Sequence, residues 1–141
     1  MSDYEKSLGH WIKRFYLLTT QAMESELTKY GLGRTQWYIL YHIAEVGTLA
    51  QRELQTILNV ESATLTPLVA ALVKKGWVIQ YPSVSDRRSK VLELTKEGVS
   101  HFSSIPNPII NIRSKAMAGL DTVQIENARK VIEQAVKNLE K

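Results

Sequence analysis

The chain has no cysteine among its 141 residues. This absence excludes disulfide bonds, thiolate metal ligands and a thiol nucleophile. Apolar runs are also short, and none approaches the roughly 20 residues that a membrane-spanning helix needs. The first residues include Asp3, Glu5 and Lys6 in place of a secretory apolar segment. We therefore expect a cytoplasmic protein that does not span a membrane.

Motifs for catalysis and metal binding are missing as well. The sequence contains no Gly-rich phosphate loop, no nucleophile elbow and no metalloprotease motif. Its histidines, His10, His42 and His101, lack both the i, i+4 helical spacing and the zinc-finger pattern of metal ligands. We therefore predict that the protein is not an enzyme and that it needs no metal ion or other cofactor.

The residues that are present fit one ordinary globular domain. Hydrophobic residues make up 44% of the chain and charged residues 23%, which is typical of a soluble domain with its own core. No internal repeat or low-complexity linker divides the sequence, so we predict a single domain over residues 1–141. The net charge of +4 favours an anionic partner only mildly, and the positions of the cations inform more than their total.

The most informative stretch is a predicted helix over Ser62–Lys75. Apolar residues recur there at steps of three and four, which places them on one helix face: Leu65, Leu68, Val69, Leu72 and Val73. Ser62 or Thr64 can cap the start of this helix, and Gly76 ends it. Pro67 is tolerable only near the first turn, where few N–H groups have partners inside the helix.

A basic hairpin follows this helix. Alternating apolar and polar residues predict strands over Trp77–Tyr81 and about Lys90–Leu94. The turn between them carries mostly charged residues: Asp86, Arg87, Arg88, Ser89 and Lys90. Taken alone, these charges could belong to an ordinary solvated turn. A helix followed by a basic hairpin is, however, the layout of a winged helix-turn-helix, in which the helix enters a major groove and the hairpin reaches the backbone or minor groove.

Three more helices are predicted before the helix at 62–75. They cover Ser2 to about Tyr30, Thr35–Val46 and Gln51–Leu58. A capping box of Ser2 and Glu5 begins the first. The third forms the helix-turn-helix pair with the helix at 62–75, which we call the reading helix.

Periodicity also predicts which side chains of these helices face the core. In the second helix the expected core residues are Ile39, Leu40, Ile43 and Val46. The other side of that helix carries Trp37, Tyr38, Tyr41 and His42. In the third helix the expected core residues are Leu54, Ile57 and Leu58. Between the two helices, Thr48 and Leu49 could add a short third strand to the hairpin.

The end of the chain is predicted to be helical with a break. Thr95 is expected to cap the helix that follows the hairpin. Asn107 as a cap with Pro108 at the first helical position then predicts an interruption and a restart. Asp121 and Gln124 form the capping pattern of a last helix.

The hairpin sequence DRRSKVLELTKEG resembles the wing and following helix start of the MarR family of bacterial transcription regulators, in which Asp-x-Arg leads into Leu-Thr-x-x-Gly. The matching positions are Asp86, Arg88, Leu94, Thr95 and Gly98. The resemblance implies that Arg88 reaches into the minor groove and that Asp86 helps to hold it. The segment 64–68 resembles the organic-hydroperoxide-sensing branch, but that branch senses with a cysteine in the first helix, which this chain lacks.

The resemblance implies a mostly α fold with a small β-hairpin wing. The winged helix-turn-helix that reads DNA would occupy residues 34–98. Helices from residues 1–33 and 99–141 would form a dimerisation layer. The implied function is that of a sequence-specific transcriptional regulator, a ligand-responsive repressor that binds a near-palindromic operator in double-stranded DNA as a homodimer. The alternative is a winged-helix interaction module that binds an acidic protein partner, because fold alone does not determine function.

Two sets of residues are candidates for these functions. The predicted DNA contacts are Gln51, Arg52, Ser62, Ala63, Thr64, Thr66, Pro67, Asp86, Arg87, Arg88, Ser89 and Lys90. A cleft for a phenolic or anionic organic effector could be lined by His10, Trp11, Arg14, Trp37, Tyr38, Tyr41 and His42. The alternative for these aromatic residues is packing in the core or in a dimer interface.

Overall fold

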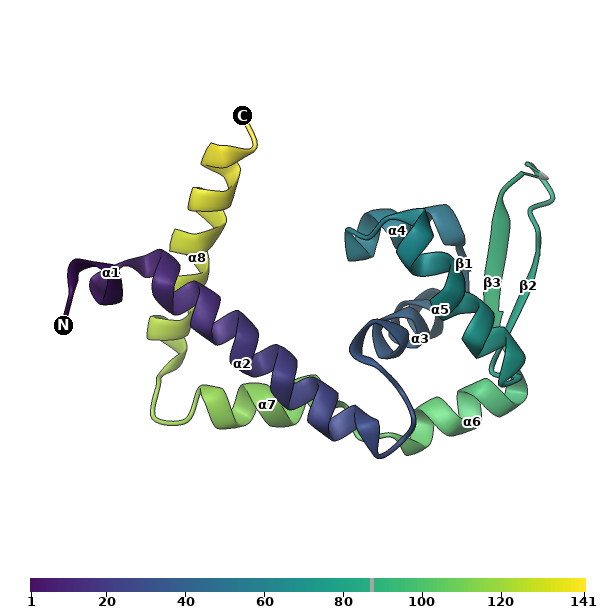
Figure 1. Cartoon of the computed structure of the whole chain (residues 1–141), viewed down its shortest axis with the longest axis horizontal. Helices are drawn as coiled ribbons and strands as arrows, with labels where there is room; N and C mark the ends of the chain where they lie inside the picture. Colours follow the sequence, from purple (N-terminus) through teal and green to yellow (C-terminus); the bar gives the residue numbers. More distant parts are fainter. Residues whose placement is uncertain (87) are drawn as a thin grey trace. The chain divides into compact units, whose positions relative to one another are not determined.

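The computed structural model describes residues 1–86 and 88–141, so the predicted DNA contact at Arg87 lies outside the described residues. The chain forms two compact units, Met1–Pro106 and Asn107–Lys141. The first unit contains helices α1 to α6 and a three-stranded sheet, and the second contains α7 and α8 (Figure 1).

The first unit begins with two helices, α1 (Asp3–Lys6) and α2 (Leu8–Thr28). The prediction of one continuous helix from Ser2 to about Tyr30 is therefore wrong. Ser7 has an extended backbone with φ −73° and ψ 142°, and its hydroxyl accepts from the N–H of His10 at 3.2 Å. Ser7 thus ends α1 and caps α2. The predicted capping box of Ser2 and Glu5 is confirmed.

The core of the first unit forms where three helices pack on the sheet. These helices are α3 (Arg34–Val46), α4 (Gln51–Leu58) and α5 (Ser62–Lys74). Their fully buried side chains include Trp37, Ile39, Leu40, Ile43, Leu54, Leu65 and Leu72. Burying an aliphatic side chain of this size stabilises a fold by about 1.5–3 kcal/mol. The packed core therefore holds α3, α4 and α5 together beneath the residues on their outer face.

The structure differs from the predicted core at Trp37, Val46 and Ile57. Trp37, predicted on the side away from the core, is fully buried, because α3 is covered on that side too and the ring centroids of Trp37 and Phe102 are 5.9 Å apart. Val46 is 63% exposed at the end of α3, just before the chain turns at Gly47 with φ +88°. Ile57 is 49% exposed in the last turn of α4, since α4 packs on the core through Leu54.

The sheet consists of β1 (Thr48–Ala50), β2 (Val78–Pro82) and β3 (Lys90–Leu94) in the order β1-β3-β2, with both pairs antiparallel. The short third strand predicted after α3 is thus confirmed. Strand β2 begins one residue later than predicted, because the N–H of Trp77 still bonds to the carbonyl of Leu72 and so ends α5.

The start of the reading helix α5 differs from the prediction. Glu61, rather than Ser62 or Thr64, is the N-cap residue, and its side chain makes no capping hydrogen bond with any described residue. Pro67 lies in the second turn of α5, past the first turn where proline is normally tolerated. The missing N–H of Pro67 leaves the carbonyl of Ala63 without its usual helical donor.

The helices after the wing have the predicted caps. In α6 (Lys96–Ser104) the Thr95 hydroxyl accepts from the N–H of Gly98 at 2.9 Å. The predicted break is confirmed: Asn107 caps α7 (Pro108–Ala116), which has a proline at its start. Asp121 and Gln124 form the capping box of α8 (Thr122–Leu139).

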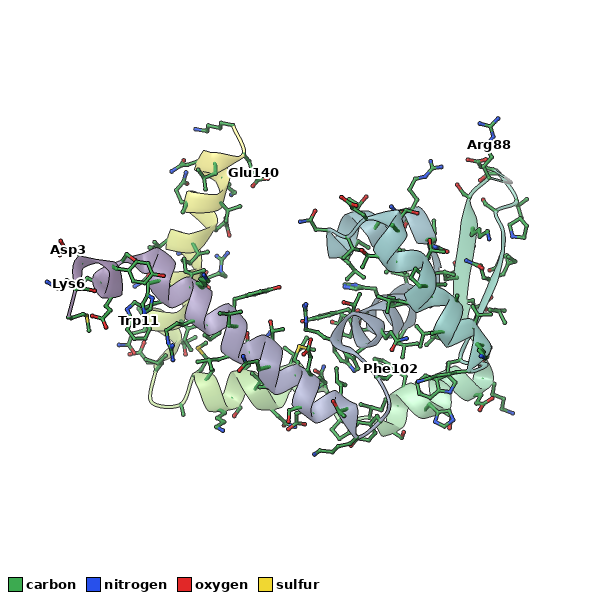
Figure 2. The ribbon with its side chains drawn as sticks, in the orientation of Figure 1. Asp3, Lys6, Trp11, Arg88, Phe102 and Glu140 are labelled. Atoms are coloured by element: carbon green, nitrogen blue, oxygen red, sulfur yellow. The ribbon has the colours of Figure 1, made fainter. Side chains whose placement is uncertain are left out.

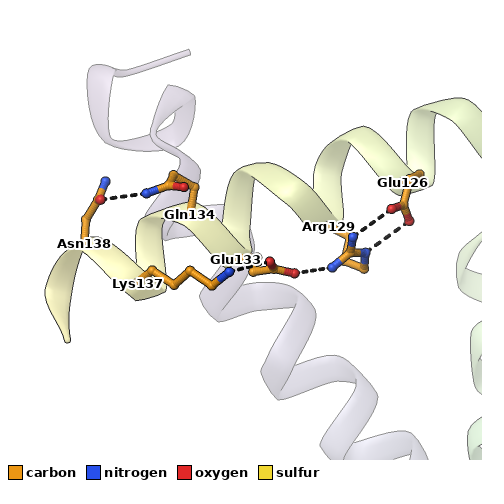
Figure 3. A network of polar contacts seen from close by, with 6 residues as sticks. All are labelled: Glu126, Arg129, Glu133, Gln134, Lys137 and Asn138. Carbon is orange, nitrogen blue, oxygen red and sulfur yellow. Dashed lines mark hydrogen bonds and ion pairs between the residues drawn. The ribbon is translucent and has the colours of Figure 1, made fainter. Parts of the chain in front are cut away.

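Helix α8 carries a row of ion pairs along one side (Figure 3). Arg129 pairs with Glu126 and Glu133, and Lys137 pairs with Glu133. Hydrogen bonds from Lys137 and Arg129 lower the pKa of Glu133, and a hydrogen bond from Arg129 lowers the pKa of Glu126. All of α8 is described, and none of its side chains is buried.

Among the described residues, no single helix is long and apolar enough to cross a membrane. In the same part of the chain, α4 and α5 reach that length and composition when taken together, but they are bent by 120° at their junction.

Candidate nucleic-acid interface

Side chains from α4, α5 and the wing meet in one open groove of about 210 Å³. The residues that line it are Gln51, Arg52, Gln55, Ser62, Arg88, Ser89 and Lys90. All of them except Gln55 are among the predicted DNA contacts. Three of the lining side chains are cationic and the others are polar, so the groove suits a polyanion such as a nucleic-acid backbone.

Two helix starts also border this groove. Gln51 and Arg52 are in the first turn of α4, and Ser62 is in the first turn of α5. Within the part of the chain that the structure describes, neither Ala50 nor Glu61 caps its helix with a side chain. The first N–H groups of α4 and α5 therefore have no capping side chain among residues 1–86 and 88–141. Such helix ends carry partial positive charge and suit phosphate oxygens.

The wing tip is organised around Asp86. Its carboxylate accepts from the backbone N–H of Arg88 at 3.0 Å and from the hydroxyl of Ser89 at 3.3 Å. The backbone N–H of Ser83 closes the tip by donating to the Ser89 carbonyl at 2.9 Å. Asp86 thus orders the backbone that carries Arg88, and the Arg88 side chain extends outward from the tip (Figure 2).

The outer face of α5 presents small groups. Ser62, Ala63, Thr64, Thr66 and Pro67 are all exposed, although only Ser62 also lines the groove. Hydroxyl groups can bond to base edges, and small apolar groups can touch the methyl group of thymine. This face has no arginine, the residue that most often binds guanine.

The predicted effector residues are separated by the structure. Tyr38 and His42 line a cavity of about 450 Å³ together with Tyr16, Arg34, Thr35 and residues 57–60. Trp37 lies in the core and does not reach this cavity, and Tyr41 stacks on Trp37 at 5.2 Å between ring centroids.

The remaining predicted effector residues are on the first half of α2. His10 and Trp11 contact each other at 5.1 Å between ring centroids, and Arg14 is exposed. Sequence reasoning missed Arg34. Its Nε atom is buried and has no hydrogen-bond partner among the described residues. An arginine at the first position of a helix, four residues before Tyr38, was the available signal.

Comparison with known proteins identifies the family. The model of the MarR family matches residues 32–90. The HTH-type transcriptional regulator YwoH of Bacillus subtilis is 30% identical over 118 residues, which cover 84% of this chain and 85% of that protein. The HTH-type transcriptional repressor IacR of Pseudomonas putida is 25% identical over 131 residues, which cover 93% of this chain and 78% of that protein.

Solved structures share the fold. A mutant of MarR from E. coli complexed with operator DNA superposes with a TM-score of 0.81 at 18% identity, covering 96% of this chain and 99% of that one. PcaV from Streptomyces coelicolor, in complex with its natural ligand, superposes with a TM-score of 0.77 at 18% identity. The match covers 97% of this chain and 96% of PcaV. The chain thus has the winged-helix fold of these proteins, and it belongs to the MarR family of transcriptional regulators.

Proposed function

We propose that this regulator is a ligand-responsive repressor that binds a near-palindromic operator as a homodimer. The observation that carries the proposal is the groove in which Arg52, Ser62 and Arg88 come together from α4, α5 and the wing. In the proposed complex α5 lies in a major groove and the wing tip lies at the neighbouring minor groove. The cations and the uncapped helix starts then contact the phosphates between them.

The homodimer is supported by an exposed apolar stripe on α2. Leu8, Trp11, Ile12, Phe15 and Leu18 are between 42% and 54% exposed. Apolar residues in such numbers on one helix mark a surface that another chain covers. Helix α8 presents a second apolar face, which includes Val131 and Val136. Two-fold symmetry would then place the two reading helices about 34–36 Å apart on DNA.

The effector is proposed to bind in the cavity beside Arg34. The buried Nε atom of Arg34, which has no hydrogen-bond partner in the described part of the chain, needs an acceptor, and a carboxylate or phenolate would supply one. Tyr38 and His42 add polar groups, while Ile57 and Val60 provide an apolar wall. The cavity borders the turn at Asn59 that joins α4 to α5. A ligand that binds better to one arrangement of this turn would shift the protein away from the DNA-binding state.

The test is a titration of the purified protein against a duplex from its own upstream region and against a scrambled duplex, each at two salt concentrations. We expect preference for the native duplex that persists at the higher salt, because contacts to bases add to the salt-sensitive contacts with phosphates. Equal, salt-sensitive binding to both duplexes would contradict sequence-specific regulation at that site. Absence of duplex binding even at low salt would favour an acidic protein partner instead.

A further inference from the structure

A hydrogen bond joins the wing to the start of the helix-turn-helix. The Nε2 atom of Gln80, on β2, donates to the Oε1 atom of Gln51 at 2.6 Å. Gln51 is the first residue of α4 and lines the groove described above. Both side chains are half-buried, so water competes less for this bond than it would at an open surface.

The bond lies at the base of the wing, where the hairpin is still paired with the third strand. Strand β1 pairs with β3 only from Val91 to Glu93, and Gln80 is opposite Leu92 within that span. Beyond it the wing is a two-stranded hairpin, which is marginally stable on its own. The position of Arg88 at the tip therefore depends on how firmly the base of the hairpin is held.

The bond also orients the amide of Gln51. Since Oε1 of Gln51 accepts from Gln80, the donors of its amide group point elsewhere, and Arg52 and Ser62 line the same groove. A phosphate oxygen in that groove is an acceptor that the Gln51 amide could meet. The Gln80 side chain thus affects both the orientation of the Gln51 amide and the position of the wing.

We propose that Gln80 is a positioning residue for DNA binding. It holds the base of the wing against α4 and presents the Gln51 amide to the DNA backbone, so that α4, α5 and the wing contact one continuous stretch of phosphates. This inference rests on the proposed binding of DNA in the groove.

The first test uses the free protein, so that it does not depend on DNA. The chain has no cysteine, so Ser85→Cys on the wing and Thr56→Cys on α4 give one pair of spin labels. Both sites are exposed. Labelled protein is diluted with unlabelled protein to remove distances between subunits, and the distance distribution is measured by electron spin resonance. Gln80→Met should broaden this distribution, because the wing base is released. An unchanged distribution would overturn the inference, whatever the DNA result.

Tyr81→Phe is the matched control. The Tyr81 hydroxyl bonds to Glu93 at 3.3 Å, so this substitution removes a hydrogen bond inside the hairpin that does not reach α4. Neighbouring residues of a strand point to opposite faces, so Tyr81 is on the other side of β2 from Gln80. We expect Tyr81→Phe to leave the label distances unchanged and the affinity for the upstream duplex within about twofold, since the bond does not touch the groove.

The second test is a double-mutant cycle on binding of the upstream duplex. Gln80→Met should weaken binding by about three- to tenfold, the range expected for one hydrogen bond, while circular dichroism shows a folded protein. The Gln51→Met/Gln80→Met double mutant should lose less binding free energy than the sum of the losses in the two single mutants. The reason is that part of the effect of Gln80 acts through the Gln51 amide, which the double mutant lacks already. Fully additive losses, or wild-type affinity in Gln80→Met, would overturn the inference. Failure of the wild-type protein to bind any duplex would contradict the proposed function, and the spin-label result would still decide whether Gln80 holds the wing.

Discussion

The α-carbon of Gly98 lies directly against the backbone of Trp77, and a Cβ atom at Gly98 would be 2.0 Å from the Trp77 carbonyl oxygen. The same carbonyl accepts from the N–H of Thr95 at 3.0 Å. The Thr95 hydroxyl in turn donates to the carbonyl of Gly76 at 2.6 Å. These contacts fasten the end of the wing and the start of α6 to the end of α5. The Leu-Thr-x-x-Gly motif thus joins the reading helix to the wing.

Gly98→Ala should destabilise the fold by about 1–3 kcal/mol, because backbone atoms must move to admit the methyl group. Thermal or urea unfolding of the purified variant measures this loss. Gly9→Ala is the matched control, since a Cβ atom at Gly9 would meet no described atom within 4 Å beyond its chain neighbours and the backbone of its own helix. It should be neutral or stabilising by up to about 1 kcal/mol, as alanine favours helix more than glycine. Equal stability of the two variants would contradict the packing of Gly98 on Trp77.

Arg88→Ala should weaken DNA binding without unfolding the protein. Arg88 is exposed at the tip, and its backbone rather than its side chain bonds to Asp86. If the side chain contacts one phosphate, the slope of log affinity against log salt should fall by about 0.9. Fluorescence anisotropy with the upstream duplex at several salt concentrations measures both quantities. Lys130→Ala on α8 removes the same charge elsewhere and should leave the affinity nearly unchanged. Equal affinity in Arg88→Ala and the wild type would refute the role assigned to Arg88.

Thr66→Ala should change sequence preference more than salt dependence. Thr66 is exposed on the outer face of α5, where its hydroxyl can bond to a base edge. Loss of one such hydrogen bond should cost about 0.5–1.5 kcal/mol against the preferred base and leave the salt slope as in the wild type. Selection from a randomised duplex pool measures the preference at each position. An unchanged preference with a smaller salt slope would place Thr66 on the phosphate backbone instead.

Phe15→Glu should weaken the proposed homodimer. Phe15 is 50% exposed within the apolar stripe of α2, and a buried unpaired carboxylate in a subunit interface is costly. Sedimentation velocity should show a shift toward monomer. Val46→Glu places the same charge on a residue that is 63% exposed on α3, outside the stripe, and should leave the assembly unchanged. An identical mass for both variants would contradict an interface at Phe15.

Local features of the fold could be predicted because their signals lie within a few residues. Gly76, Thr95, Asn107 and Asp121 end or cap helices as predicted, since a cap depends on the N–H groups of the next turn. The interruption at Ser7 was missed. Serine is tolerated inside helices, and the apolar pattern continues on both sides of it.

Features that depend on distant residues could not be predicted in this way. The burial of Trp37 depends on Phe102, which comes from another helix after the wing. The groove needs the pairing of β1 with β3, which brings the wing beside the start of α4. The sequence predicted Arg52 and Arg88 as separate DNA contacts, Arg88 through the resemblance of the wing, but it does not show the strand register that places both in one groove.

The most direct test of DNA reading by this groove is cleavage of DNA from a known point on the wing. Ser85→Cys introduces the only thiol of the chain, to which an iron chelate can be attached. On the upstream duplex we expect two clusters of strand cleavage in the minor groove, one on each flank of a two-fold axis. Cleavage spread evenly over the duplex, or confined to its centre, would contradict the claim that each wing contacts a minor groove on one flank of the operator.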